Sequence, residues 1–126
     1  MAMSIQSLLL IAFSIALSSA AQVLLKMGMS SPRVQLALAD AGLPAQILTI
    51  AMTPTVILGL ASFGASAVVW LFVLSRIDVS QAYPFVALGI VITVIAGNLF
   101  LGEALPVLRI VGVFAILAGV IAVARS

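Results

Sequence analysis

The feature that most constrains this chain is its division into four long apolar segments, at about residues 4–27, 55–75, 81–101 and 106–124. Each segment approaches the length of about 20 apolar residues that crosses a hydrocarbon core of roughly 30 Å as a helix. Of the 126 residues, 65% are hydrophobic and only 6% are charged. A soluble domain carries roughly 25% charged residues. The sequence therefore predicts an all-α protein in which residues 1–126 form a single four-helix membrane domain.

The connections between these segments differ greatly in length. The two later ones are so short that the second, third and fourth helices must run antiparallel to their neighbours. The first connection, residues 28–54, contains Arg33, Asp40 and three prolines. We predict a surface loop here, with an interfacial turn of helix between Ala45 and Met52. The alternative is a lip that contacts a lipid headgroup.

The composition excludes several function classes. Cysteine and histidine are both absent, and the chain has three acidic residues. Disulfides and thiolate chemistry are thereby excluded, and the usual general base and commonest metal ligand are missing. We therefore expect a protein that is not an enzyme and that uses no cofactor and no metal ion. The five basic residues form no cluster, so we expect no nucleic-acid partner.

The first segment contains four polar side chains at intervals of four residues: Ser14, Ser18, Gln22 and Lys26. Residues four apart lie on one face of a helix. Polar groups in a membrane face the bundle interior or a wet cavity, because hydrocarbon offers them no hydrogen-bond partner. A stripe with a cation and no acid predicts a path that accepts an anionic group. The alternative for Lys26 is that it extends along the helix to reach the interface without binding a substrate.

Five further polar residues are candidates for contact with a substrate. Ser62 and Ser66, at i and i+4, either line the path or bond back to their own helix. Tyr83 either contributes to the path or anchors its helix at the interface. Glu103 and Arg109 flank a turn, where they form a local ion pair or contact a headgroup.

The last segment has a face of small residues, which recur at spacings of three and four: Gly112, Ala115, Gly119 and Ala122. Such faces let helices approach closely in lipid, either within one chain or between two. Because four helices with one polar stripe enclose little space, we expect a dimer. Its partner is a second copy or a similar small protein. The nearly even distribution of Lys and Arg leaves parallel and antiparallel pairing both open.

Several short motifs occur in an order that resembles a known family. They are Ala20-Ala21-Gln22-Val23-Leu24-Leu25-Lys26, then Ala82-Tyr83-Pro84, Leu101-Gly102-Glu103, Arg109 and the Gly/Ala-rich last helix. The chain, apart from residues 30–54, resembles the four-helix members of the drug/metabolite transporter superfamily. It is similar in particular to the small EamA-type proteins typified by aminoarabinose-phosphoundecaprenol flippase subunits. This resemblance implies a dimer-forming, multi-pass protein of the bacterial inner membrane. It also implies transport of a polyprenyl-phosphate-linked sugar or a similar anionic lipid.

Two other functions stay open. One is export of small molecules in the manner of the small multidrug resistance proteins, which carry a glutamate in the middle of their first helix. Ser18 occupies the corresponding position, eight residues before Lys26. A charge at the bilayer centre costs at least about 2.5–3.5 kcal/mol, so it is kept where a mechanism needs it. Its absence argues against proton-coupled export of cationic drugs.

The other function is that of a non-transporting membrane subunit in a glycolipid-assembly complex. The sugar, the driving force and the direction of transport do not follow from the sequence.

Overall fold

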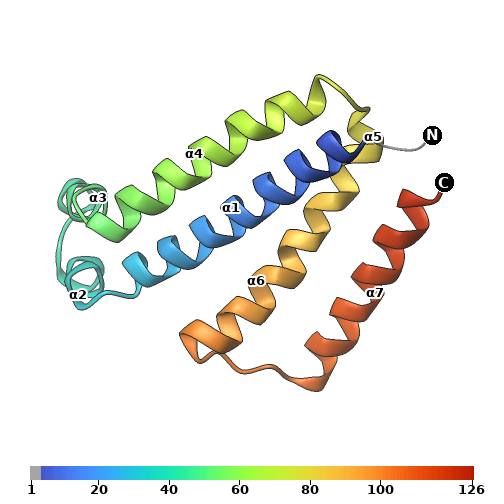
Figure 1. The fold of residues 1–126 in the computed structure, drawn as a ribbon. Helices are drawn as coiled ribbons and strands as arrows, with labels where there is room; N and C mark the ends of the chain where they lie inside the picture. Colours follow the sequence, from blue (N-terminus) through green and yellow to red (C-terminus); the bar gives the residue numbers. More distant parts are fainter. Residues whose placement is uncertain (1–3) are drawn as a thin grey trace.

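The computed structural model describes residues 4–126, which contain only helices and connecting turns (Figure 1). Four helical spans are long and apolar enough to cross a membrane: Ile5–Met29, Pro54–Leu74, Val79–Leu101 and Val107–Ala124. The first, second and fourth are single helices, α1, α4 and α7. The all-α class with four spans is thus confirmed.

Helices α1 and α4 form the most closely packed pair, and two glycines allow it. A Cβ atom at Gly59 of α4 would lie 2.9 Å from Cγ of Leu25 and 3.1 Å from the Leu25 backbone nitrogen. A Cβ atom at Gly28 of α1 would lie 3.0 Å from the backbone nitrogen of Val56. Because glycine has no side chain, the two backbones can approach closely along this contact.

The third span is interrupted near its start. It consists of α5 (Val79–Ala82), a 3₁₀ turn, η1 (Tyr83–Phe85), and α6 (Val86–Leu101). Pro84 has no backbone N–H and cannot make the i→i−4 bond, which accounts for the local change of helix type. The span ends at Gly102, whose φ of +68° is the left-handed conformation that glycine adopts readily.

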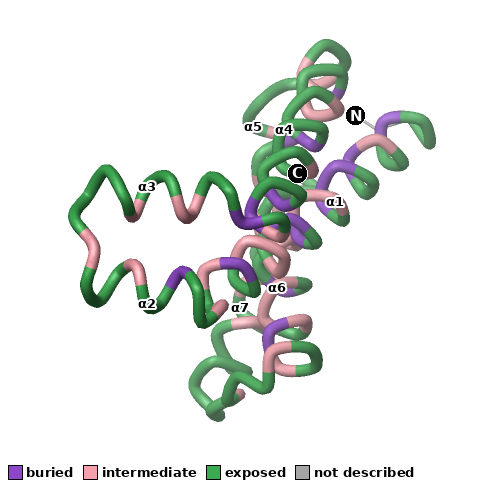
Figure 2. Tube along the Cα trace, turned by 90° about the vertical axis from the view of Figure 1, so that its left-hand side faces the viewer, coloured by how far each residue is buried: buried purple, intermediate pink, exposed green. Residues whose placement is uncertain are grey.

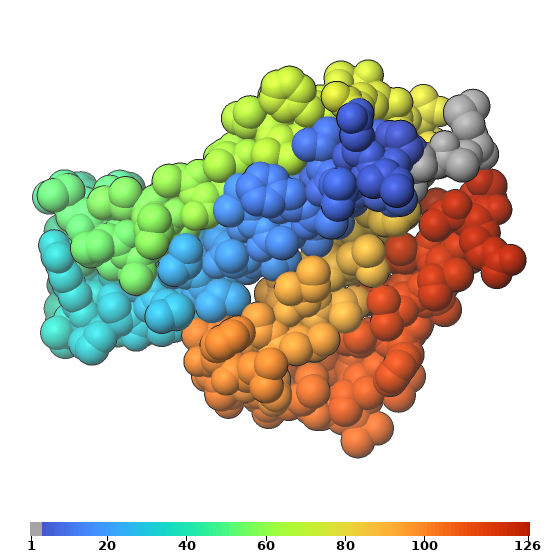
Figure 3. All heavy atoms as spheres, viewed as in Figure 1, coloured from blue at the N-terminus to red at the C-terminus, as the bar shows by residue number. Residues whose placement is uncertain are grey.

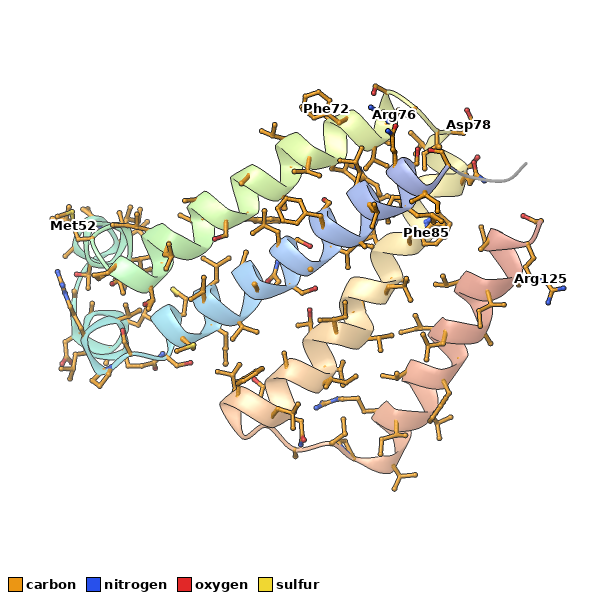
Figure 4. The ribbon with its side chains drawn as sticks, viewed as in Figure 1. Met52, Phe72, Arg76, Asp78, Phe85 and Arg125 are labelled. Atoms are coloured by element: carbon orange, nitrogen blue, oxygen red, sulfur yellow. The ribbon has the colours of Figure 1, made fainter. Side chains whose placement is uncertain are left out.

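The hydrophobic core lies near the chain termini, where α1, α4 and α5 meet. Its buried members are Ile11, Ile15, Val73 and Ala82. At the same end, where Arg76 lies beside the start of α1 (Figure 4), Nη1 of Arg76 donates a hydrogen bond to Oε1 of Gln6 over 3.1 Å. Figure 1 shows α6 beside α1 and α7 at the outer edge, with the α1–α4 pair and the α6–α7 pair diverging away from the termini. Helix α7 is the least buried of the four spans in the single chain, with Val120 as its one buried residue (Figure 2).

The connection at residues 28–54 differs from the predicted loop. It contains two helices, α2 (Pro32–Asp40) and α3 (Leu43–Ala51), whereas the sequence predicted one turn at Ala45–Met52. Each helix has a proline in its first turn, where the fixed φ favours helix and the missing N–H costs nothing. We name α2 and α3 together the α2–α3 hairpin. It projects sideways from the end of the α1–α4 pair, seen end-on in Figure 1 and lengthwise in Figure 2.

Candidate functional site

A cavity of about 400 Å³ lies between α1, α4 and α6, with hydroxyl and amide side chains set into an apolar wall. We call it the polar cavity. Its lining residues are Ser18, Ser19, Gln22, Phe63, Val86, Gly89, Ile90, Thr93 and Val94. Two of the four polar residues predicted from the first segment, Ser18 and Gln22, therefore face one space.

The other two members of that stripe lie elsewhere. Ser14 is buried against α4, where its Oγ donates to the carbonyl oxygen of Ser66 over 3.0 Å. Lys26 is exposed in the last turn of α1 and does not line the polar cavity. The reason is helix geometry: each step of four residues turns about 40° around the axis, so Ser14 and Lys26 point about 120° apart.

The two serines of α4 do not line the polar cavity. Ser66 is buried, and its Oγ donates to the carbonyl oxygen of Phe63 over 2.7 Å. Ser62 is half-buried and also lies outside the lining. Ser66 therefore joins α4 to α1 through its backbone carbonyl, and Phe63 is the residue that α4 contributes to the cavity wall.

Two hydroxyl residues of the cavity were missed from the sequence. Thr93 Oγ1 donates to the carbonyl oxygen of Gly89 over 2.7 Å, and Ser19 Oγ donates to the same oxygen over 3.4 Å. Ser19 thus links α1 to α6 at the cavity wall. The sequence does contain a sign that Thr93 could line a cavity, because this hydroxyl residue lies one turn after Gly89 within an apolar span. Bonding of a hydroxyl to its own helix is common, however, so the pattern did not single Thr93 out.

Glu103 and Arg109 lie beside the polar cavity. They line a second cavity of about 230 Å³ with Ala104, Thr93 and Val94. Because Thr93 and Val94 border both spaces, the two cavities are neighbours. Both charged residues are exposed, so this space is accessible to polar groups from outside.

Glu103 and Arg109 are held by separate backbone contacts. The Arg109 Nη1 donates to the carbonyl oxygen of Ala104 over 2.8 Å. The Glu103 backbone N–H donates to the carbonyl oxygen of Gly97 over 3.1 Å, and the Glu103 carbonyl accepts from Asn98 Nδ2 over 2.9 Å. The Glu103 carboxylate lies against Gly97, in the space that a side chain there would occupy. Within residues 4–126 the structure shows no Glu103–Arg109 ion pair, which was one of the two predicted roles.

An apolar groove of about 610 Å³ follows the α1–α6 contact, on helices that Figure 3 shows side by side. We call it the α1–α6 groove. Its lining residues are Ala16, Ser19, Ala20, Val23, Leu24, Met27, Ile92, Ala96 and Phe100. Ser19 is the one polar residue of this lining and also belongs to the polar cavity. Ser19, which is 3% exposed and bonded to Gly89 of α6, is therefore a wall residue shared by the polar cavity and the apolar groove.

The remaining candidates lie on the outside of the chain. Tyr83 is 64% exposed, in the η1 turn near the termini. The small residues of α7 are exposed too, and a Cβ atom at Gly112 or Gly119 would meet nothing within 4 Å. In residues 4–126 this face is therefore not used for packing within the chain. The remaining interpretation, a contact with a second chain, stays a prediction.

Acidic groups are scarce around these spaces. The four spans contain no Asp or Glu, although Lys26 and Arg109 lie within the first and fourth spans. Among residues 4–126, no three His, Cys, Asp or Glu side chains come together in a way that would hold a metal ion. The polar cavity is therefore lined by hydroxyl, amide and apolar side chains, and the charged residues Glu103 and Arg109 line the neighbouring cavity.

Four apolar spans, three of which line the polar cavity, define a multi-pass membrane protein. Residues 2–125 match the EamA-like transporter family, so the chain belongs to that family and is a membrane transporter. This confirms the predicted place in the drug/metabolite transporter superfamily. No curated protein and no solved structure matches the chain. The closer resemblance to aminoarabinose-phosphoundecaprenol flippase subunits therefore stays a prediction.

Proposed function

We propose that this EamA-family chain moves an anionic lipid across the bacterial inner membrane, with a polyprenyl-phosphate-linked sugar as its specific substrate. The observation that carries the proposal is that the polar cavity and the α1–α6 groove lie next to each other, with Ser19 as a wall residue of both. A lipid has a polar headgroup and an apolar chain, and these two adjoining spaces suit the two parts. A small soluble substrate has no use for an apolar groove beside its cavity.

The charge distribution supports an anionic headgroup. Lys26 is in the last turn of α1, and Arg109 is in the first turn of α7. Both lie at the end of the bundle away from the termini (Figure 1). A lysine binds phosphate as a point charge with rotatable donors, which suits a headgroup that must move on. In this proposal Lys26 and Arg109 attract the phosphate at the membrane surface, and Ser18, Gln22 and Thr93 hydrogen-bond the sugar.

Proton-coupled export of cationic drugs has less support. That mechanism needs an acid within the membrane to bind the proton and the cation in turn, and the four spans contain none. A charge within the bilayer is costly and is kept where a mechanism needs it. The absence of an acid from the spans therefore argues against this mechanism. We therefore propose that the chain transports an anion and does not change it chemically.

A second chain completes the proposed path. The α1–α6 groove is not covered by the rest of the chain at Phe100, a lining residue that is 76% exposed. Transporters commonly place their substrate between two repeats, and this chain supplies only one four-helix unit. We propose that the exposed face of α7 forms the contact, through Gly112, Ala115, Gly119 and Ala122. The partner is a second copy or a similar small protein.

Native mass spectrometry of the purified protein tests this proposal. We expect anionic lipids to remain bound to the wild-type protein after extraction from bacterial membranes. The variant Ser18→Leu fills the polar cavity with an apolar side chain and should lose them. Ser75→Leu is the matched control: both serines donate to a carbonyl three residues earlier, but Ser75 lies at the exposed end of α4. Equal lipid retention by the two variants, or a wild-type protein that retains only zwitterionic lipids, would contradict the proposal.

A further inference from the structure

Helix α3 of the α2–α3 hairpin exposes an unusual amount of apolar surface. Three large side chains of α3 are more than half exposed, Leu43, Ile47 and Leu48, and so is Met52, the residue that directly follows the helix. At 100° per residue they cover about half of the helix circumference. No charged residue occurs in Leu43–Ala51. In water, a surface of this kind would favour aggregation, and large exposed apolar patches mark interaction sites.

Polar side chains of the hairpin donate hydrogen bonds to backbone carbonyl groups of the hairpin itself or of the adjoining end of α1. Gln46 Nε2 donates to the carbonyl oxygen of Ala41 over 2.9 Å, and Thr49 Oγ1 donates to that of Ala45 over 2.9 Å. On α2, Gln35 Nε2 donates to the carbonyl oxygen of Met29 over 2.6 Å. Each of these side chains therefore has one donor satisfied within the chain. This lowers the cost of placing the segment in a region of low polarity.

The charges of the hairpin are confined to α2. Arg33 and Asp40 are seven residues apart, so they lie on the same face of that helix, and both are exposed. One helix of the hairpin, α3, is therefore uncharged, whereas the other, α2, carries both charged side chains. A surface helix at a membrane boundary has this division between apolar and charged groups.

The position of the hairpin in the chain determines the surroundings of its apolar side chains. Residues Ser30 and Ser31 alone separate α1 from α2, and Met52 and Thr53 alone separate α3 from α4. Both α1 and α4 are membrane spans. The hairpin therefore starts and ends at the level where two spans leave the hydrocarbon, and it extends sideways from there (Figure 2). Its exposed apolar side chains continue the lipid-facing surface of those spans.

We infer that the α2–α3 hairpin lies within the membrane–water boundary. Helix α3 lies among the parts of the acyl chains nearest to the headgroups, and the charged face of α2 lies among the headgroups. Because α1 is joined to α2 by two residues, the depth of the hairpin sets the depth of Lys26 in the last turn of α1. A second copy of the chain is a less suitable occupant, since the apolar side chains extend around about half of α3 rather than along one narrow seam. The inference does not depend on which substrate is transported.

Spin labels at single cysteines test this inference, and the chain is convenient because it has no native cysteine. We suggest Leu43→Cys and Leu48→Cys on α3, Asp40→Cys at the end of α2, and Leu60→Cys on α4. Leu60 is 55% exposed within a span, so it reports full immersion in lipid. The labelled proteins are reconstituted in nanodiscs that contain one-third anionic lipid. Relaxation by oxygen, which concentrates in hydrocarbon, is then compared with relaxation by a water-soluble nickel chelate.

The expected order of the oxygen-to-nickel ratio is Leu60→Cys, then the two α3 labels, then Asp40→Cys. Each α3 label should exceed Asp40→Cys several-fold. A nickel accessibility at both α3 positions equal to that at Asp40→Cys would place the hairpin in water and overturn the inference. Protection of both α3 positions from both reagents would overturn it as well, because a protein surface would then cover α3. A high ratio at Leu60→Cys in the same preparation verifies that the protein is inserted.

Discussion

Replacing Gly59 by alanine tests the close packing that holds α1, and with it Ser18 and Gln22, against α4. The added Cβ would lie 2.9 Å from Leu25 Cγ and 3.1 Å from the Leu25 backbone nitrogen. The Leu25 side chain can rotate, but its backbone nitrogen moves only if the two helices separate. Overpacking of this kind costs about 1–3 kcal/mol.

Gly64→Ala on the same helix is the matched control, because a Cβ there would meet nothing within 4 Å. Both substitutions gain the same helix propensity, about 1 kcal/mol for Gly to Ala. The difference between the two variants therefore isolates the contact. We expect Gly59→Ala to be less stable than Gly64→Ala by about 1–3 kcal/mol.

The assay is unfolding in mixed micelles with increasing mole fraction of sodium dodecyl sulfate, followed by circular dichroism. Gly59→Ala should unfold at a lower detergent fraction than Gly64→Ala. Coinciding unfolding curves for the two variants would refute the reasoning, since they would mean that α1 and α4 do not approach closely at Gly59.

Three further predictions concern transport and assembly. Lys26→Ala should insert and assemble normally but lose lipid transport in proteoliposomes, whereas Lys26→Arg should retain part of it; normal transport by Lys26→Ala would remove the lysine from the mechanism. Cells that express the wild-type protein, with Ser18 unchanged, should gain no resistance to quaternary ammonium compounds, because the spans have no acid to bind a cation; a robust increase in the growth-inhibiting concentration would contradict this. Gly112→Leu or Gly119→Leu should split or misalign the dimer and reduce transport; cysteine crosslinking along each helix checks this, and an active monomer or crosslinks from every helix except α7 would show that the contact lies elsewhere.

The four spans could be predicted because they depend on local properties, length and hydropathy. The prediction for the polar stripe was less complete for a geometric reason. The spacing of four placed Ser18 and Gln22 correctly on one face, but the accumulated rotation turns Ser14 toward α4 and leaves Lys26 outside the cavity lining. Which neighbour a helix face meets depends on how the whole bundle is packed, and no single segment encodes that.

The residues that sequence reasoning missed are those whose role arises from tertiary contacts. Ser19 is distinguished from Ser18 only by the proximity of the Gly89 carbonyl on another helix. The α2–α3 hairpin was expected as a loop because its two helices have nine residues each, too short for hydrophobic periodicity to identify them clearly. From the sequence alone, no role was assigned to Pro32 and Pro44, which lie in the first turn of the two helices.

The central claim, movement of an anionic lipid, is tested most directly by measuring transbilayer movement in proteoliposomes that contain the wild-type protein. Three fluorescent lipids with the same polyprenyl chain are compared: one with a phosphate-linked sugar, one with the phosphate alone, and one with an uncharged sugar ether. Quenching by a membrane-impermeant reductant reports the fraction that reaches the outer leaflet. We expect protein-dependent movement of the two phosphate lipids, fastest with the sugar attached, and movement of the uncharged lipid only at the rate of protein-free liposomes. Equal rates for charged and uncharged lipids, or no rate above that of protein-free liposomes, would contradict the account.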